Sequence, residues 1–154
     1  MSFDHKPYNK EEKARIEAAG GSVSMKRVNG DLAVSRAFGD FCYKQATNVE
    51  AAEQAVTCKP DFVVHERDNE KDEFLILACD GIWDVMSNEE CSSYVREKMA
   101  EGYHNLSRIC EALIDECLEK GSKDNMSALI VTLPAAHFGP EINPPPSNPK
   151  IPKH

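Results

Sequence analysis

The sequence predicts an α+β fold, and three observations carry this prediction. The apolar run Phe74–Cys79 is too short for a buried helix and is typical of a strand covered on both faces. The dipeptide Asn29–Gly30, flanked by apolar residues, is the strongest short signal for a β-hairpin. The segment Leu106–Lys120 carries apolar residues at helical spacing and predicts an amphipathic helix.

Composition narrows the class of protein. The 154 residues are about one domain, and 41% hydrophobic with 29% charged residues is typical of a globular chain. A net charge of −8 argues against nucleic acid as the main partner. No apolar run approaches the roughly 18 residues of a membrane span. The six cysteines are scattered without a Cys-x-x-Cys pair, which predicts a reducing compartment, the cytoplasm or nucleus.

The N-terminal third predicts one helix and a long loop. Asn9 and Glu12 have the spacing of an N-cap pair, so a short helix is expected over Lys10–Ala19. Cys42–Cys58 is expected to be mostly loop, with one helical turn within Glu50–Val56.

The predicted strands form two antiparallel pairs. Ser22–Val28 and Asp31–Ser35 are expected to be the two arms of the hairpin around Asn29–Gly30. Asp61–Glu66 is expected to be a strand that an acidic loop connects to the Phe74 strand, making an antiparallel pair.

The C-terminal half predicts two helices and a strand. Ser87 and Glu90 form a capping box for a helix over about Asn88–Ala100. Gly121 is a natural end for the amphipathic helix, and Met126–Leu133 is expected to be a strand. Residues 134–154 contain seven prolines and predict an extended Pro-rich tail without a core. A solvated linker is favoured there over an SH3-type ligand.

Two acids stand where strands begin and end. Asp80 follows the Phe74 strand, and Asp124 precedes the Met126 strand, so antiparallel pairing would place both at one sheet edge. Hard oxygen ligands from two loops suit Mg²⁺ or Mn²⁺, although either acid alone is more typical of a turn. Gly81 would let the backbone approach whatever the acids hold.

Four blocks of the sequence resemble the metal-dependent protein serine/threonine phosphatases of type 2C, nearest to the eukaryotic alpha/beta-like members. They come in that family's order and span essentially Ser2–Leu133. The blocks are Asp4–Pro7, the run from Ala19 to Asp40, Leu77–Ser87 and Gly121–Ser127.

The resemblance implies a fold and a reaction. It implies part of a four-layer α/β/β/α sandwich of antiparallel sheets, with residues 1–133 in the catalytic domain and about 5–58 forming the flap and adjoining loops. In that family a metal-bridging water attacks the phosphorus of phosphoserine or phosphothreonine in proteins, with no phosphoenzyme. Two Mg²⁺ or Mn²⁺ ions, or three, would serve as cofactors.

Carried over motif by motif, the resemblance also implies site residues. Asp80 and Asp124 would be metal ligands, and Asp84 would join Asp80 in holding a third, weaker metal. Arg27 belongs to the flap and would contact substrate.

The chain also departs from the family pattern. It begins near the midpoint of the family's domain, and lacks the Glu-Asp metal pair, the Asp-Gly-His motif and the phosphate-binding arginine of the N-terminal half. No catalytic residue is therefore expected in this chain, and His5 is expected to make a structural hydrogen bond. A partial gene model, a truncated isoform and an expressed fragment are all compatible with this start.

Two functions stay open at this point. The chain is either part of an active phosphatase or a non-catalytic regulatory or interaction module. A haloacid-dehalogenase-type phosphatase is a weaker third idea, because no Asp-x-Asp pair precedes Asp80. Alone, the chain is expected to bind cations weakly, to have negligible activity, and to expose an inner apolar sheet face that favours self-association.

Overall fold

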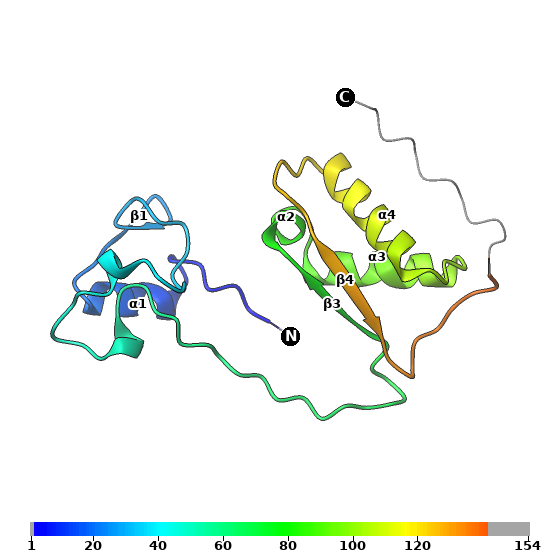
Figure 1. The fold of residues 1–154 in the computed structure, drawn as a ribbon, viewed down its shortest axis with the longest axis horizontal. Helices are drawn as coiled ribbons and strands as arrows, with labels where there is room; N and C mark the ends of the chain where they lie inside the picture. The colour runs from blue at the N-terminus through cyan, green and yellow to red at the C-terminus, as the bar shows by residue number, and fades with distance from the viewer. Residues whose placement is uncertain (1, 142–154) are drawn as a thin grey trace. The chain divides into compact units, whose positions relative to one another are not determined.

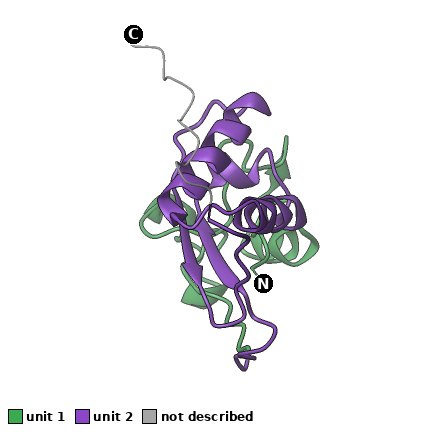
Figure 2. Ribbon diagram, turned by 90° about the vertical axis from the view of Figure 1, so that its right-hand side faces the viewer, with its two compact units in different colours: residues 1–65 green, residues 66–154 purple. Residues whose placement is uncertain are grey.

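A computed structural model describes residues 2–141. The chain divides into two compact units, residues 1–65 and 66–154, which Figure 2 distinguishes by colour. Within the described residues, every helix is too short or too polar to cross a membrane.

Unit 1 contains one α-helix, a small hairpin and two short 3-10 turns. The helix α1 begins after Asn9, but the predicted capping pair is wrong: the Asn9 side chain donates to the carbonyl of Asp4 (2.6 Å) and makes no cap bond. Its expected partner, Glu12, is instead buried and forms ion pairs with two arginines. The elements are α1 (Lys10–Ala18), β1 (Val23–Ser24), β2 (Arg27–Val28), η1 (Phe41–Tyr43) and η2 (Ala51–Glu53).

The hairpin turn lies earlier than predicted. Strands β1 and β2 pair antiparallel and are connected by Met25–Lys26, where both residues have positive φ (48° and 63°). Neither residue is one that a left-handed turn favours, so the sequence gives no signal for this reversal.

The Asn29–Gly30 turn is real but does not connect two long strands. Both residues have positive φ (51° and 76°), as a two-residue reversal requires. The predicted arm Asp31–Ser35 is not a strand, since only Leu32 bridges back to Val28. The chain therefore makes two tight turns in succession instead of one hairpin.

A buried carboxylate connects α1 to the segment around Ser35 and Arg36 in unit 1. Glu12 is 2% exposed, and its carboxylate forms ion pairs with the guanidinium groups of Arg15 (2.8 Å) and Arg36 (2.6 Å). It also accepts a hydrogen bond from the Ser35 hydroxyl (2.6 Å). The apolar core around it is small and comprises Ile16, Val28, Ala55 and Val56. Charge pairing therefore holds much of this unit together.

The network continues to the N-terminal segment. Arg36 also binds Asp61 (2.9 Å), and Asp61 in turn lies 2.8 Å from Nε2 of His5. The predicted structural hydrogen bond of His5 is thus confirmed.

The predicted strand over residues 61–66 is wrong. These residues are irregular, and Phe62 and Val64 are exposed. A strand needs a partner for its backbone groups, and among the described residues the Phe74 strand pairs with a later segment instead.

Unit 2 is a two-stranded antiparallel sheet with helices (Figure 1). Its strands β3 (Phe74–Ala78) and β4 (Ala128–Thr132) pair in a register that runs from Phe74 opposite Thr132 to Ala78 opposite Ala128. The helices are α2 (Asp80–Trp83), α3 (Asn88–Ala100) and α4 (Leu106–Glu119).

The helix boundaries of unit 2 follow the predicted signals. Ser87 Oγ accepts from the Glu90 amide (3.1 Å), and the Glu90 carboxylate accepts from the Ser87 amide (2.8 Å), which confirms the capping box of α3. Gly121, with φ of 92°, ends α4 as expected.

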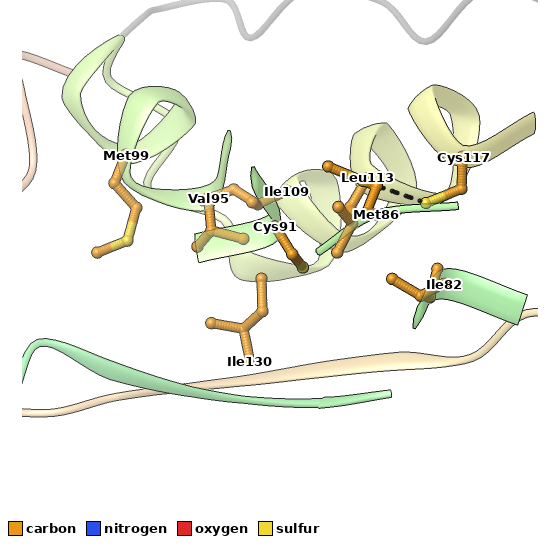
Figure 3. Close-up of a cluster of buried hydrophobic side chains, with 9 residues drawn as sticks. All are labelled: Ile82, Met86, Cys91, Val95, Met99, Ile109, Leu113, Cys117 and Ile130. Carbon is orange, nitrogen blue, oxygen red and sulfur yellow. Dashed lines mark hydrogen bonds between the residues drawn. The ribbon is translucent and has the colours of Figure 1, made fainter. Parts of the chain in front are cut away.

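One face of the sheet packs on α3 and α4 (Figure 3). Ile130 of β4 faces the helices, and the Cys117 thiol lies 3.4 Å from the Met86 sulfur within the core. The buried members of this cluster are Ile82, Met86, Cys91, Val95, Met99, Ile109, Leu113, Cys117 and Ile130.

The opposite face of the sheet is exposed. Leu75, Leu77, Leu129 and Val131 are 45%, 55%, 52% and 42% exposed, respectively. The prediction that the Phe74 strand is covered on both faces is therefore wrong, whereas the predicted uncovered apolar face is present.

The segment after β4 packs back on the helices. Phe138 lies against the His104 ring (centroids 5.0 Å apart), and the Gly139 amide donates to the Met99 carbonyl (3.0 Å). The predicted Pro-rich tail thus begins with residues that contact the core. Its remainder, residues 142–154, lies outside the described residues.

Candidate metal centre

Two of the predicted ligands lie one helical turn apart. Cys79 is the extended N-cap residue of α2, Asp80 opens that helix, and Asp84 is its C-cap. The Asp84 amide donates to the Asp80 carbonyl (2.8 Å), and both side chains are exposed. The short helix therefore fixes the backbone spacing of these two acids.

The third predicted ligand lies in the loop before β4. Asp124 is exposed, and its Oδ1 accepts from the Asn125 amide (2.7 Å). Because Ala78 pairs with Ala128, the loop reaches the same end of the sheet as the start of α2. The antiparallel juxtaposition predicted for Asp80 and Asp124 is confirmed at the level of the backbone.

The loop is closely packed on α2. A β-carbon added to Gly81 would lie 2.5 Å from the Asn125 carbonyl oxygen, so only glycine fits without displacement. The close approach predicted at Gly81 therefore exists, but its partner is the loop backbone. Ser122 Oγ adds a hydrogen bond to the Gly81 carbonyl (2.7 Å).

The Cys79 thiol also contacts the loop. It donates to the Asn125 carbonyl and accepts from the Ser127 amide, both at 3.3 Å. The hydrogen bond with Ser127 is the largest of the effects that lower the pKa of this thiol. The sequence predicts no role for Cys79 or Ser122. The position of Cys79, directly before Asp80 at the end of a strand, is the signal that could have indicated a role at the site.

A hollow of about 390 Å³ lies between the two segments. Asp84 and Asp124 both line it, with Lys123 beside them, whereas Asp80 is not among its lining residues. The structure therefore brings two of the three predicted acids to one open, water-accessible space.

The donor set fits a hard cation only in part. Carboxylate oxygens with no thiolate or imidazole suit Mg²⁺ or Mn²⁺. In the part of the chain that the structure describes, however, no three acidic, histidine or cysteine side chains are grouped closely enough to hold a metal ion. These acids can serve as ligands of such a cation, with its other positions left for further groups.

The predicted substrate contact, Arg27, lies in unit 1. It stands on β2, is exposed, and its guanidinium donates to the Asp31 carbonyl just beyond the Asn29–Gly30 turn.

Comparison with known proteins gives relatives that are named as protein phosphatases. The family model "Protein phosphatase 2C" matches residues 1–126. The chain is 50% identical over 141 residues to human "Protein phosphatase 1A", covering 92% of this chain and 36% of that protein. It is 49% identical over 140 residues to "Protein phosphatase ppm-1.A" of Caenorhabditis elegans, covering 91% and 29%, respectively.

A solved structure matches as well. A phosphatase from Toxoplasma gondii aligns with a TM-score of 0.73 and 33% identity, over 90% of this chain and 41% of that chain. The chain thus spans about a third of the length of the curated relatives it matches. The extent of the family match and the identity to these relatives show that this chain belongs to the protein phosphatase 2C family.

Proposed function

We propose that this chain supplies part of the metal centre of a protein serine/threonine phosphatase. The observation that carries the proposal is the pairing of β3 with β4, which brings the Asp80–Asp84 helix and the Asp124 loop to one sheet end in a chain of this family. Phosphoserine and phosphothreonine in proteins would be the substrates.

In this proposal the three acids hold divalent cations, Mg²⁺ or Mn²⁺. When bound, such cations lower the pKa of water and neutralise charge on phosphoryl oxygens. Asp80 contributes an oxygen ligand from the first residue of α2 and Asp124 one from the loop before β4, while Asp84 adds one from the C-terminal end of α2. The tight packing of Gly81 on Asn125 limits the movement of the Asp124 loop relative to α2.

The chain alone is proposed to be inactive. Among the residues that the structure describes, no three acidic, histidine or cysteine side chains are grouped closely enough to hold a metal ion, and an apolar sheet face stays exposed to water. As an isolated molecule it would act as a non-catalytic module, which is the second candidate function. The exposed face is the observation that favours this alternative.

Binding of Mn²⁺ to the 154-residue chain, followed by electron paramagnetic resonance, tests the ligand assignment. Asp80→Asn and Asp124→Asn should weaken binding, while Glu119→Gln, an exposed acid near the end of α4, should not. Equal affinity in all variants would contradict the assignment.

Activity is tested with a phosphothreonine peptide and Mn²⁺. The chain alone should release no phosphate, whereas a complete phosphatase domain carrying these residues should. In that complete domain, Asp80→Ala or Asp124→Ala should abolish turnover. Turnover by the chain alone would refute its proposed inactivity.

A further inference from the structure

The β3–β4 ladder ends where the two acid-bearing segments begin. The last paired residues are Ala78 and Ala128, and the Cys79 amide adds one more backbone bond to the Ser127 carbonyl (3.2 Å). From Asp80 onward the backbone turns into α2, so its amides no longer face the loop.

The Cys79 thiol makes the next two connections across this gap. Its sulfur lies 3.3 Å from both the Asn125 carbonyl oxygen and the Ser127 amide nitrogen. Cys79 occupies the N-cap position, where a side chain usually bonds back to its own helix, yet it makes no cap bond. The thiol is directed across to the loop instead.

Ser122 makes a matching connection on the other side of Asp124. Its hydroxyl donates to the Gly81 carbonyl at 2.7 Å and is partly shielded from water. Asp124 thus lies in a short stretch that is fastened to α2 before and after it, while its own carboxylate stays exposed.

We propose that Cys79 and Ser122 are positioning residues that fasten the Asp124 loop to the Asp80 turn. Neither side chain needs to touch a cation. Each restricts the backbone that carries a ligand, and a ligand held within a fraction of an ångström loses little entropy when it binds. The effect on cation affinity rests on the proposed function, whereas the fastening of the loop does not.

Amide hydrogen exchange of the full chain tests the fastening directly. In Cys79→Ala, the Ser127 amide loses its acceptor, so its exchange should accelerate about fivefold or more, as expected for one ordinary hydrogen bond. Cys110→Ala removes a similarly half-buried thiol from α4 and should leave the Ser127 amide unchanged. Unchanged exchange at Ser127 in Cys79→Ala would overturn the proposal.

Ser122→Ala is the second variant, and it decides the case if Cys79→Ala fails to fold. It should accelerate exchange at Asn125 while the capping amide of Glu90 on α3 stays protected. Equal protection of Asn125 in this variant and in the unaltered chain would count against a positioning role for Ser122.

Mn²⁺ affinity distinguishes the fastening of the loop from its effect on cation binding. Cys79→Ala should raise the Kd about fivefold, and Cys110→Ala should not. If exchange accelerates but the Kd stays constant, the thiol fastens the loop without serving cation binding, and its positioning role is refuted. If the unaltered chain binds no Mn²⁺, the ligand assignment of the proposed function fails, and the exchange result still decides whether the loop is fastened.

Discussion

The Asn125 carbonyl oxygen lies where a side chain at Gly81 would have to stand, 2.5 Å from the position of its β-carbon. The Met126 side chain crowds the same point at 2.8 Å. Helix α2 and the Asp124 loop are therefore in close contact at Gly81, and at that point the space between them admits no additional carbon atom.

Gly81→Ala should consequently separate the two segments. We expect a loss of about 1–3 kcal/mol in the free energy of unfolding, as for other overpacked positions, together with weaker Mn²⁺ binding. Chemical denaturation followed by the fluorescence of Trp83 measures the first effect. Ser93→Ala, at an exposed position on α3, is the control and should change neither quantity; wild-type stability in Gly81→Ala would contradict the close packing.

Removing a core side chain between α4 and the sheet should destabilise unit 2 strongly. Leu113 is fully buried, and Leu113→Ala should cost about 2–5 kcal/mol because it leaves a cavity. Leu118→Ala, the same change at an exposed position on the same helix, should cost less than about 1 kcal/mol. Similar losses in both variants would contradict a core position for Leu113.

Unit 1 should lose stability in acid through Glu12. Burial by itself would raise the pKa of this carboxyl, but hydrogen bonds from Arg36, Ser35 and Arg15 outweigh it and lower the pKa to about 2. A lowered pKa adds stability above the ordinary value of 4.5, and that contribution is lost as the pH falls toward 2. Hydrogen exchange of the α1 amides between pH 5 and pH 2 should follow this loss.

Glu12→Gln should destabilise unit 1 at neutral pH, because it leaves two arginines without their buried partner. It should also remove the acid dependence of α1 that is due to this carboxyl. Glu11→Gln, an exposed neighbour on the same helix, should preserve both properties. If the acid dependence of α1 persists undiminished in Glu12→Gln, a group other than Glu12 must cause it.

The exposed sheet face should govern self-association. Leu77→Thr combined with Leu129→Thr should lower the binding of an apolar-surface dye and the sedimentation-derived mass, since both residues stand on the exposed face. Threonine is β-branched, a shape that strands favour, so the fold should persist. Ile76→Thr, on the helix-covered face, should instead lower stability; an unchanged mass in the double variant would exclude this face as the site of association.

The sequence predicts the parts of this chain whose signals are local. Ser87 and Glu90 lie three residues apart and form the predicted capping box, and the helix ending at Gly121 needs only its own periodicity. The sequence places Asp80 and Asp124 at one sheet end only on the condition that their two strands pair antiparallel, as β3 and β4 do.

The incorrect predictions concern interactions that no short window contains. The residues after Asp61 have strand-like composition, but a strand forms only where a partner accepts its hydrogen bonds. Met25–Lys26 reverses the chain without glycine or asparagine, because β1 and β2 pair across it. Glu12 has the spacing of a capping residue, yet Arg36, 24 positions later, and Arg15 draw its carboxylate into the interior.

The two units differ in the kind of force that keeps them folded. Unit 1 depends on a carboxylate held by two guanidinium groups, whereas unit 2 depends on a continuous apolar core between helices and sheet. Lowering the pH from about 4.5 toward 2 should therefore loosen unit 1 while the helices of the second unit persist. Cooling, which weakens the hydrophobic effect, should act chiefly on the second unit. A single melting temperature for this chain would then average two transitions with different physical origins.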